Sequence, residues 1–410
     1  MTQIVKIDGA AAGEKPQKLI GATFVLSWMV NVFQYIVMYF LITTMALYAV
    51  RQFAASDAAA GFASSAFVVG ATVARLFTGY IVDRFGRRRI MILGLIAATV
   101  ITGLYLTAAS LPLLIIVRLV HGFAYAFMST AVMALVQSAI PASRRAEGTG
   151  YFALGSTLAA AVGPALALFM VGSFSYELLF QVALGSSMIS LVLGLFLRDP
   201  ARSSRAALPA RPKLTLRAIM DPAVIPIGIF MLLIGLCYSG VITYLNAYAE
   251  QRDVVTGASL FFVAYALSML IMRFILGKVQ DRRGDNAVIY FGLFFFVLAL
   301  ALLSFATADW QVIVAGMLSG LGYGSLMPAA QAIAVNAVPA HKLGTGISTL
   351  LLLADAGIGL GPIALGILIS ATGYGTMYLL LAGIAVIAVL FYQFTHGRRP
   401  EARRGRGLAL

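Results

Sequence analysis

Charged side chains are scarce in this chain: Asp, Glu, Lys and Arg make up 11% of its 410 residues, whereas hydrophobic residues make up 61%. In soluble domains about a quarter of the residues are charged. Apolar runs longer than about 18 residues, enough for a helix to cross a bilayer, recur along the whole sequence. The composition therefore excludes a soluble globular domain and indicates a membrane protein with many spans.

Cysteine and histidine are also scarce. The single cysteine, Cys237, excludes a disulfide within the chain and a thiolate metal site. The three histidines, His121, His341 and His396, fall in separate segments, so they form neither the metal-ligand cluster nor the nucleophile–base pair that an enzyme in the membrane needs. A glycine-rich phosphate loop ending in Lys-Ser or Lys-Thr is missing, which argues against ATP-driven activity. We expect no enzyme activity, no metal and no cofactor.

Twelve apolar segments have the length of a membrane span. They lie at roughly 20–48, 58–82, 90–109, 112–138, 146–171, 176–197, 223–248, 256–280, 287–307, 310–336, 345–370 and 374–395. The least apolar internal stretch, residues 198–222, holds four prolines and six basic residues and separates six spans from six. We therefore predict an N-terminal half at 1–197, a cytoplasmic linker at 198–222, and a C-terminal half with a basic tail at 223–410.

Positive charge is distributed unevenly along the chain. A net charge of +14 would suit nucleic acid, but 24 of the 29 Lys and Arg residues fall in the two terminal tails and in the loops after even-numbered spans. Cytoplasmic loops of membrane proteins carry such an excess of Lys and Arg. The pattern predicts that both termini lie in the cytoplasm, and it favours anionic lipid over nucleic acid beside the basic tail. We expect a bacterial plasma (inner) membrane location.

The two halves carry an internal repeat with an offset of 198 residues. The stretch "ARLFTGYIVDRFGRRRIM" at 74–91 aligns with "MRFILGKVQDRRGDNAVI" at 272–289, and the same offset holds without a gap from residue 75 to residue 366. Six spans in each half give both halves the same orientation. We therefore expect an all-α membrane protein with twelve transmembrane helices, in two six-helix halves related by pseudo-two-fold symmetry about the membrane normal.

The loop between the second and third spans has the pattern G-x-x-x-D-R-x-G-R-R-R. It is formed by Gly79, Asp83, Arg84, Gly86, Arg87, Arg88 and Arg89. This pattern is the hallmark loop of the major facilitator superfamily, which the chain resembles over nearly its full length. The second copy keeps Gly277, Asp281, Arg282 and Gly284, with Asp285 and Asn286 where arginines would follow, so we interpret it as degenerate. The resemblance implies a secondary transporter with its substrate site between the halves.

Two further segments resemble motifs of this family. In the fourth span, Arg118 and Gly122 fit an R-x-x-x-G pattern, with His121 where glutamine is commoner. In the fifth span, the exporters' glycine–proline motif is matched at Gly150, Gly163 and Pro164, with Ala159 and Ala167 at two other glycine positions. These matches favour export as the direction of transport.

The hallmark loop predicts a gate between the halves. A helix N-terminus carries partial positive charge, so the Asp83 carboxylate is suited to bind one in the neighbouring half, while Gly79 permits close helix approach. The predicted gating residues are Arg75, Gly79, Asp83, Arg84, Arg87 and Arg273. For the arginines of the loop, an equally good explanation is the excess of positive charge on the cytoplasmic side.

Ionisable residues within spans are costly, by roughly 2.5–3.5 kcal/mol at a helix centre on insertion scales, and they mark functional sites. Here they are Arg75, Arg118, His121, Arg273 and Asp355. Asp355 is the only acid well inside a span, within reach of Arg75 across the two halves or of Arg273 in its own half. We predict that Asp355 is a proton-coupling switch; the alternative is a static ion pair.

In this family the first, fourth, seventh and tenth spans line the cavity. The substrate-binding residues predicted from these spans are Asn31, Gln34, Tyr35, Arg118, His121, Tyr125, Tyr238, Tyr323 and Gln331. Each aromatic residue among them fits packing as well as ligand contact. For His121, a neutral, hydrogen-bonded ring is the alternative to a proton carrier.

None of the four cavity spans holds an acid in its interior, whereas exporters of cationic drugs usually place a carboxylate there. Arg118 instead suits a substrate with a carboxylate, and the surroundings of Asp355, Arg273 and "RRAEG" at 144–148 resemble the opine-metallophore exporter branch of the family. We predict a monomeric, proton-coupled exporter of a small carboxylate-bearing or zwitterionic molecule. The alternatives are an uptake symporter or exchanger for an organic anion, and a membrane receptor or enzyme without transport.

Overall fold

The computed structural model describes residues 19–199 and 219–405, and within these ranges it is helical, with twelve segments long and apolar enough to cross a membrane. The first half holds α1 (Ala22–Phe53), α2 (Asp57–Phe85), α3 (Arg87–Leu104), α4 (Leu111–Ala139), α5 (Arg145–Ser173) and α6 (Tyr176–Phe196). The second half holds α8 (Ile225–Gln251), α9 (Val255–Arg283), α10 (Asp285–Ser304), α11 (Asp309–Asn336) and α12 (Leu343–Tyr392). Most of the predicted linker, 200–218, lies outside the described residues.

The long helix α12 is two spans joined at a bend. Gly373 has a φ of +79°, a conformation that glycine adopts at little cost, and it lies between the spans predicted at 345–370 and 374–395. A π-helical turn, η5 (Gln393–Gly397), and the short helix α13 (Pro400–Arg403) follow. The prediction of twelve spans in two halves is confirmed.

Serine residues start three helices of the first half. The side chains of Ser56, Ser110 and Ser175 accept a hydrogen bond from the backbone N–H three residues later, at the start of α2, α4 and α6. Such a cap satisfies one of the N–H groups that have no partner within the first helical turn. These local signals fix where the chain re-enters the bundle after each turn.

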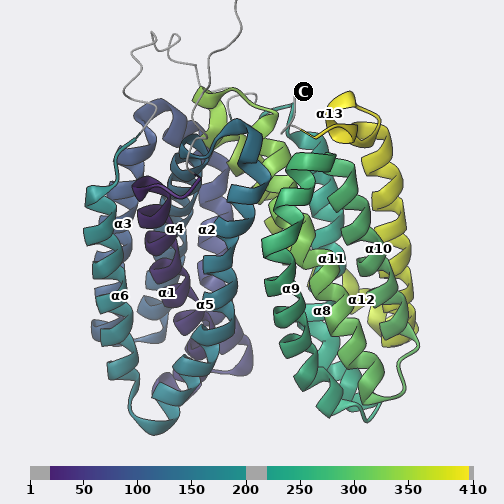
Figure 1. Cartoon of the computed structure of the whole chain (residues 1–410). Coiled ribbons are helices and arrows are strands. Elements are labelled where there is room, and N and C mark those ends of the chain that lie inside the picture. The colour runs from purple at the N-terminus through teal and green to yellow at the C-terminus, as the bar shows by residue number, and fades with distance from the viewer. Residues whose placement is uncertain (1–18, 200–218, 406–410) are drawn as a thin grey trace, which may run out of the picture.

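The two halves lie side by side (Figure 1). Helices α2 and α12 pack together across the halves, and so do α5 and α9. These pairs are equivalent under the repeat, since adding 198 to the bounds of α2 gives those of α9, and adding it to the first residue of α5 gives the first residue of α12. The interface between the halves is therefore built twice from equivalent helices.

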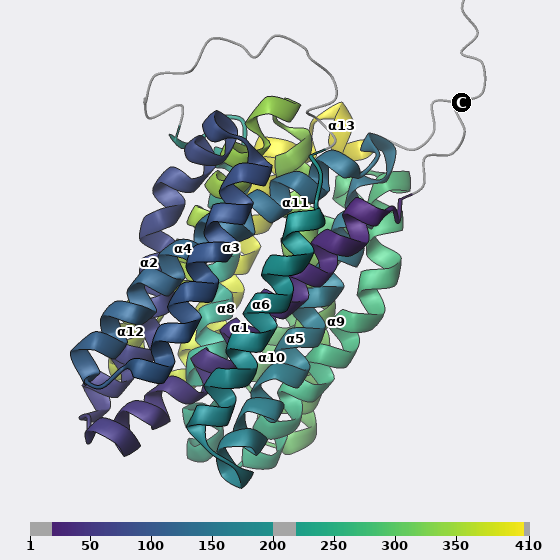
Figure 2. The same ribbon diagram turned by 90° about the vertical axis from the view of Figure 1, so that its left-hand side faces the viewer.

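We call the two ends of the bundle the basic end and the far end. The basic end carries the turns at Gly86, Pro141, Gly284 and Pro339 together with the described C-terminal residues, and the far end carries the turns at Ala54, Ala108, Phe174, Asp253 and Phe305. Figures 1 and 2 show the C-terminal segment at the top, which is the basic end. Figure 1 also shows the ribbons of the two halves meeting at this end and standing apart toward the far end.

The C-terminal segment packs onto the second copy of the hallmark loop. His396 pairs with Asp285 at 3.0 Å, and the Asn286 side chain donates a hydrogen bond to the backbone oxygen of Gly397. Asp285 and Asn286 stand where Arg87 and Arg88 stand in the first copy. The departure from the motif, interpreted above as degeneracy, thus coincides with a specific contact to the C-terminal segment.

Helices within each half pack closely at glycines. A Cβ at Gly122 of α4 would collide with the carbonyl oxygen of Phe67 in α2, and a Cβ at Gly320 of α11 would collide with that of Tyr265 in α9. The two glycines are 198 residues apart, so the same close contact occurs in both halves. The outer surface is apolar, with Phe196 69% and Phe294 64% exposed, as a lipid-facing surface requires.

Candidate functional site

Asp83 of α2 binds the first turn of α12 in the other half. Its carboxylate accepts hydrogen bonds from the backbone N–H of Gly344 at 2.9 Å and of Thr345 at 2.7 Å, and from the Thr345 hydroxyl at 2.8 Å. These N–H groups have no partner within their own helix, and the helix dipole favours an anion beside them. One turn away, a Cβ at Gly79 would lie 2.6 Å from the Cα of Thr345, so glycine is needed for this approach.

Asp281 of α9 makes the equivalent contact with α5. Its two carboxylate oxygens accept hydrogen bonds from the N–H groups of Ala146 at 3.1 Å and Glu147 at 2.8 Å. A Cβ at Gly277 would lie 2.7 Å from the Cα of Glu147. Asp281 matches Asp83 in the repeat but was not among the predicted gating residues, although the constant offset of 198 was a sufficient signal.

The arginines of the hallmark loop divide between the halves. Arg87 donates to the backbone oxygen of Ala340 in the second half, whereas Arg84 donates to Tyr80 of its own helix and Arg88 to Leu197 of its own half. Of the predicted gating arginines in the loop, the structure therefore places Arg87 across the interface and Arg84 beside Tyr80.

Closer to the middle of the interface, Arg75 of α2 pairs with Asp355 of α12. The Arg75 Nε atom lies 2.5 Å from the Asp355 Oδ2 atom. Between this pair and Asp83, the Ser348 hydroxyl donates to the backbone oxygen of Arg75 at 2.6 Å and lies 2.9 Å from the Thr78 hydroxyl. Of the two partners open to Asp355 from the sequence, the structure thus selects Arg75, and the pair joins the two halves.

Arg273 of α9, the repeat equivalent of Arg75, has a different environment. Its Nη2 atom lies 3.6 Å from the sulfur of Met269, while Nε and Nη1 are buried without a hydrogen-bond partner among the described residues. The position equivalent to Asp355 is Thr157, 198 residues earlier, whose hydroxyl bonds to the Ala153 carbonyl of its own helix. The repeat therefore supplies two arginines but one carboxylate.

Six tyrosines surround these charges. In the first half, the rings of Tyr35 and Tyr39 lie 6.3 Å apart, as do those of Tyr35 and Tyr125. In the second half, Tyr238 stacks on Tyr323 at 3.7 Å and on Tyr265 at 5.9 Å. Tyr35 and Tyr323, from opposite halves, each lie near both Asp355 and Arg273. The structure thus brings the predicted Tyr35, Tyr125, Tyr238 and Tyr323 together with the charged groups.

Tyr39 and Tyr265 were not predicted as site residues. Tyr39 lies one helical turn after Tyr35, and Tyr265 is the repeat equivalent of Phe67. Helix spacing was the available signal for Tyr39. For Tyr265 the sequence offered no signal, since its span was not expected to line the site.

Arg118 and His121 lie inside the first half. Arg118 is 0% exposed and donates to the backbone oxygens of Ala63 at 3.1 Å and Ser64 at 2.6 Å in α2. The Nδ1 atom of His121 lies 3.2 Å from the hydroxyl of Tyr105. Tyr105 thus provides His121 with a hydrogen-bond partner within its own half. Arg118 likewise has its partners in the first half, and among the described residues it does not contact the charged groups between the halves.

The three predicted amides are buried. Gln34 donates to the Ser187 hydroxyl of α6 at 3.3 Å, so its side chain is directed within the first half. Asn31 and Gln331 are 6% and 9% exposed. The structure therefore does not bring Gln34 to the charged groups between the halves.

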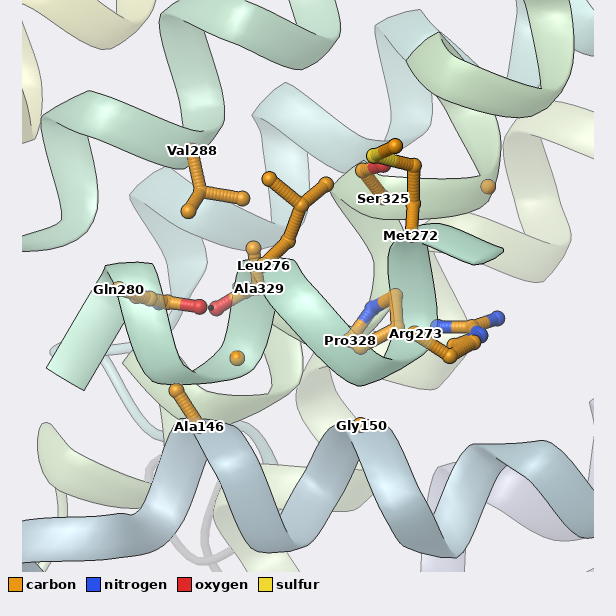
Figure 3. A pocket seen from close by; sticks show the side chains of 12 residues that line it. Ala146, Gly150, Met272, Arg273, Leu276, Gln280, Val288, Ser325, Pro328 and Ala329 are labelled. Carbon is orange, nitrogen blue, oxygen red and sulfur yellow. Dashed lines mark hydrogen bonds between the residues drawn. The ribbon is translucent and has the colours of Figure 1, made fainter. Parts of the chain in front are cut away.

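A small cavity of about 20 Å³ lies between α5 and the helices α9 and α11. Figure 3 shows Gln280 and Arg273 at opposite ends of its lining, with Ala146 and Gly150 of α5 closing one side. This volume fits about one water molecule and is too small for an organic substrate. Among residues 19–199 and 219–405, no group of three or more His, Cys, Asp or Glu side chains is placed to hold a metal ion.

Comparison with known proteins gives one consistent family. The sequence matches the Major Facilitator Superfamily over residues 27–255 and 254–409. A transporter of this type from Escherichia coli K12, YhhS, is 24% identical over 83% of this chain and 84% of its own length. The multidrug resistance protein MdtG of Dickeya zeae is 24% identical over 81% of this chain and 82% of its own length.

A solved structure shares the fold. The human organic anion transporter MFSD10 (TETRAN) superposes with a TM-score of 0.77 at 16% identity, covering 91% of this chain and 99% of its own. At this identity the likeness shows the fold alone.

Proposed function

Since the chain belongs to the major facilitator superfamily, we propose that it is a proton-coupled secondary transporter that exports a small carboxylate-bearing or zwitterionic molecule. The chain is a membrane transporter and not an enzyme. The proposal places the basic end and both termini in the cytoplasm of a bacterial cell, with the monomer as the transporting unit. Transport proceeds by alternating access, in which the halves open first to one side and then to the other.

The ion pair between Arg75 and Asp355 carries the proposal. It joins α2 of the first half to α12 of the second, and Asp355 is the acid deep within a span. A guanidinium favours the charged carboxylate, whereas apolar surroundings favour the neutral acid. Moving the halves apart removes Arg75 from Asp355, and this shifts the balance between the charged carboxylate and the neutral acid. Asp355 can then bind a proton in one state and release it in the other.

The contacts of Asp83 and Asp281 supply the gate in this proposal. The hydrogen bonds and ion pairs described between the halves run from Asp355 to the basic end. This arrangement supports a state closed to the cytoplasm. Opening to the cytoplasm requires both carboxylates to leave the helix N-termini that they bind.

The balance of charge supports an anionic or zwitterionic substrate. Among the described residues around Arg75 and Arg273, Asp355 is the one carboxylate, and it is already paired with Arg75. A cationic substrate would therefore find no free acid there. Arg273 and the tyrosine hydroxyls instead offer hydrogen-bond donors. The human structural neighbour is an organic anion transporter, which agrees with this chemistry, and the multidrug resistance protein among the relatives supports efflux.

Transport by the purified protein in proteoliposomes tests the proposal. Benzoate and phenylalanine serve as anionic and zwitterionic probes and tetraphenylphosphonium as a cationic one, with the membrane potential clamped by valinomycin and potassium. Proton antiport predicts protein-dependent accumulation of benzoate or phenylalanine in vesicles with an acidic interior. Without the protein, benzoate is a weak acid and distributes toward the alkaline side, so the two results are opposite. Accumulation only in an alkaline interior would indicate symport, and accumulation of the cation alone would contradict the proposed substrate class.

A further inference from the structure

We propose that Arg273 binds the carboxylate of the substrate and that the stacked tyrosines Tyr238, Tyr265 and Tyr323 bind an aromatic ring attached to it, so that the substrate class is an aromatic carboxylate. This inference rests on the proposed transport function and specifies its substrate. The repeat is asymmetric here, since Arg75 has Asp355 as its partner while Arg273 faces a helix with Thr157 at the equivalent position.

The charges at the centre of the interface do not balance among residues 19–199 and 219–405. Arg75 and Asp355 neutralise each other, which leaves the charge of Arg273 without a carboxylate partner in this part of the chain. An unpaired guanidinium within the membrane is costly, and such groups are functional by default. A substrate carboxylate would neutralise it and would receive the two hydrogen bonds that the buried Nε and Nη1 atoms do not make here.

The position of Arg273 suits a ligand held between the halves. Its backbone lies against α5, where a Cβ at Gly150 would be 3.2 Å from the Arg273 carbonyl oxygen. Figure 3 shows its guanidinium at the end of the small cavity lining, directed away from Gln280. On the other side, Tyr35 of the first half and Tyr265 and Tyr323 of the second lie near Arg273. A carboxylate bound there would touch both halves.

The tyrosines next to Arg273 determine what is attached to the carboxylate. Tyr238 and Tyr323 are parallel within 8°, and Tyr265 continues the stack with Tyr238 at an interplanar angle of 24°. Tyr238 and Tyr323 are partly exposed, and their rings have apolar faces with hydroxyls at the edge. A planar ring stacks on such a face at little entropic cost, whereas a flexible alkyl chain gains no stacking contact. The combination of a single arginine and a ring stack favours aromatic monocarboxylates.

The binding of benzoate to the purified full-length protein, measured by calorimetry, tests the inference. Acetate and cyclohexanecarboxylate control for the ring, and benzamide controls for the charge. We expect benzoate to bind at least about tenfold more tightly than the other three, since both the charged hydrogen bonds and the ring stack contribute. Equal affinity for acetate and benzoate would overturn the ring assignment, and benzamide binding as tightly as benzoate would overturn the carboxylate assignment.

Two variants test Arg273 in different ways. Arg273→Gln removes the charge, and Thr157→Asp leaves Arg273 in place but introduces a carboxylate at the position equivalent to Asp355. Each should weaken benzoate binding at least about tenfold, because hydrogen bonds to charged groups are lost or are already occupied. Arg283→Gln, at an exposed arginine of the basic end, is the matched control and should bind benzoate as the unmodified protein does.

The outcomes separate this inference from the proposed function. If Arg273→Gln and Thr157→Asp bind benzoate with unchanged affinity, Arg273 is not the docking residue, even when proton-driven transport depends on Asp355. If the unmodified protein binds none of the aromatic carboxylates but transports another molecule against a proton gradient, the substrate class is wrong and the proposed function stands. Tyr323→Leu, which removes one ring of the stack, should weaken benzoate but not acetate binding.

Discussion

At the scale of single residues, hydrogen-bond partners distinguish Arg118 from Arg273. Arg118 donates to two backbone carbonyls of α2 and leaves Nη1 as its one buried nitrogen without a partner among the described residues. Arg273 leaves both Nε and Nη1 without one, and it lies beside residues of both halves. A guanidinium with internal partners stabilises the fold, and one without them is available to a ligand. The two arginines therefore have separate roles in this account.

We predict opposite effects for Arg118→Gln and Arg273→Gln. Arg118→Gln should lower the unfolding midpoint in detergent by several degrees, because it loses hydrogen bonds to a charged group worth roughly 1.5–3 kcal/mol each, and should keep benzoate affinity within about threefold. Arg273→Gln should keep or raise the midpoint, since it removes an unpaired charge, and should lose benzoate affinity. A loss of affinity in Arg118→Gln without a loss of stability would return Arg118 to the substrate site.

At the scale of helices, two equivalent contacts close the basic end. Asp83 binds the N-terminus of α12, and Asp281 binds that of α5. Each contact joins a carboxylate to backbone N–H groups in the other half. Because the helices are related by the repeat, weakening either contact should favour the same opening motion.

We predict that Asp83→Asn and Asp281→Asn each shift the population toward the state open at the basic end, and that the double variant shifts it further. Loss of the charge weakens the interaction with the helix dipole, worth roughly 0.3–2 kcal/mol per site, which corresponds to a several-fold change in population. Spin labels on cysteines at exposed Arg89 and His341, in a Cys237→Ser background, report the distance between the halves. Glu177→Gln, at the far end, is the control. An unchanged distance distribution in the double variant would contradict the gating role.

Much of this architecture follows from the sequence, since twelve apolar runs and a gap-free repeat determine the helices and their two-fold arrangement. The position of Asp83 followed as well, because the repeat and the helix dipole suggest a partner in the other half. The placement of Arg118 did not. Its spacing on α4 identifies a helix face, but whether that face meets α2 or the other half depends on packing, including the close contact at Gly122. The partner of Asp355 likewise required the structure, because both arginines lie at similar depth.

At the scale of the whole molecule, the polar contacts between the halves follow one another from the basic end inward. Asp83 and Asp281 hold the basic end, the hydroxyls of Thr78 and Ser348 follow, and the pair of Arg75 and Asp355 lies deepest. When the halves rock, the Asp83 contact and the ion pair must break together, because both join α2 to α12. Gate opening and the loss of the arginine partner of Asp355 are therefore one event, which is the physical basis of coupling in this account.

Transport by Asp355→Asn tests that coupling most directly. The amide mimics a permanently neutral acid, so the variant should lose benzoate accumulation driven by a proton gradient in proteoliposomes. It should retain gradient-free exchange of labelled for unlabelled benzoate, and it should bind benzoate as tightly as the unmodified protein or more tightly, since Arg75 loses its partner. Glu177→Gln, at an exposed carboxylate of the far end, should transport normally. Proton-driven accumulation at the unmodified rate in Asp355→Asn would show that the pair is structural and that the proton binds elsewhere.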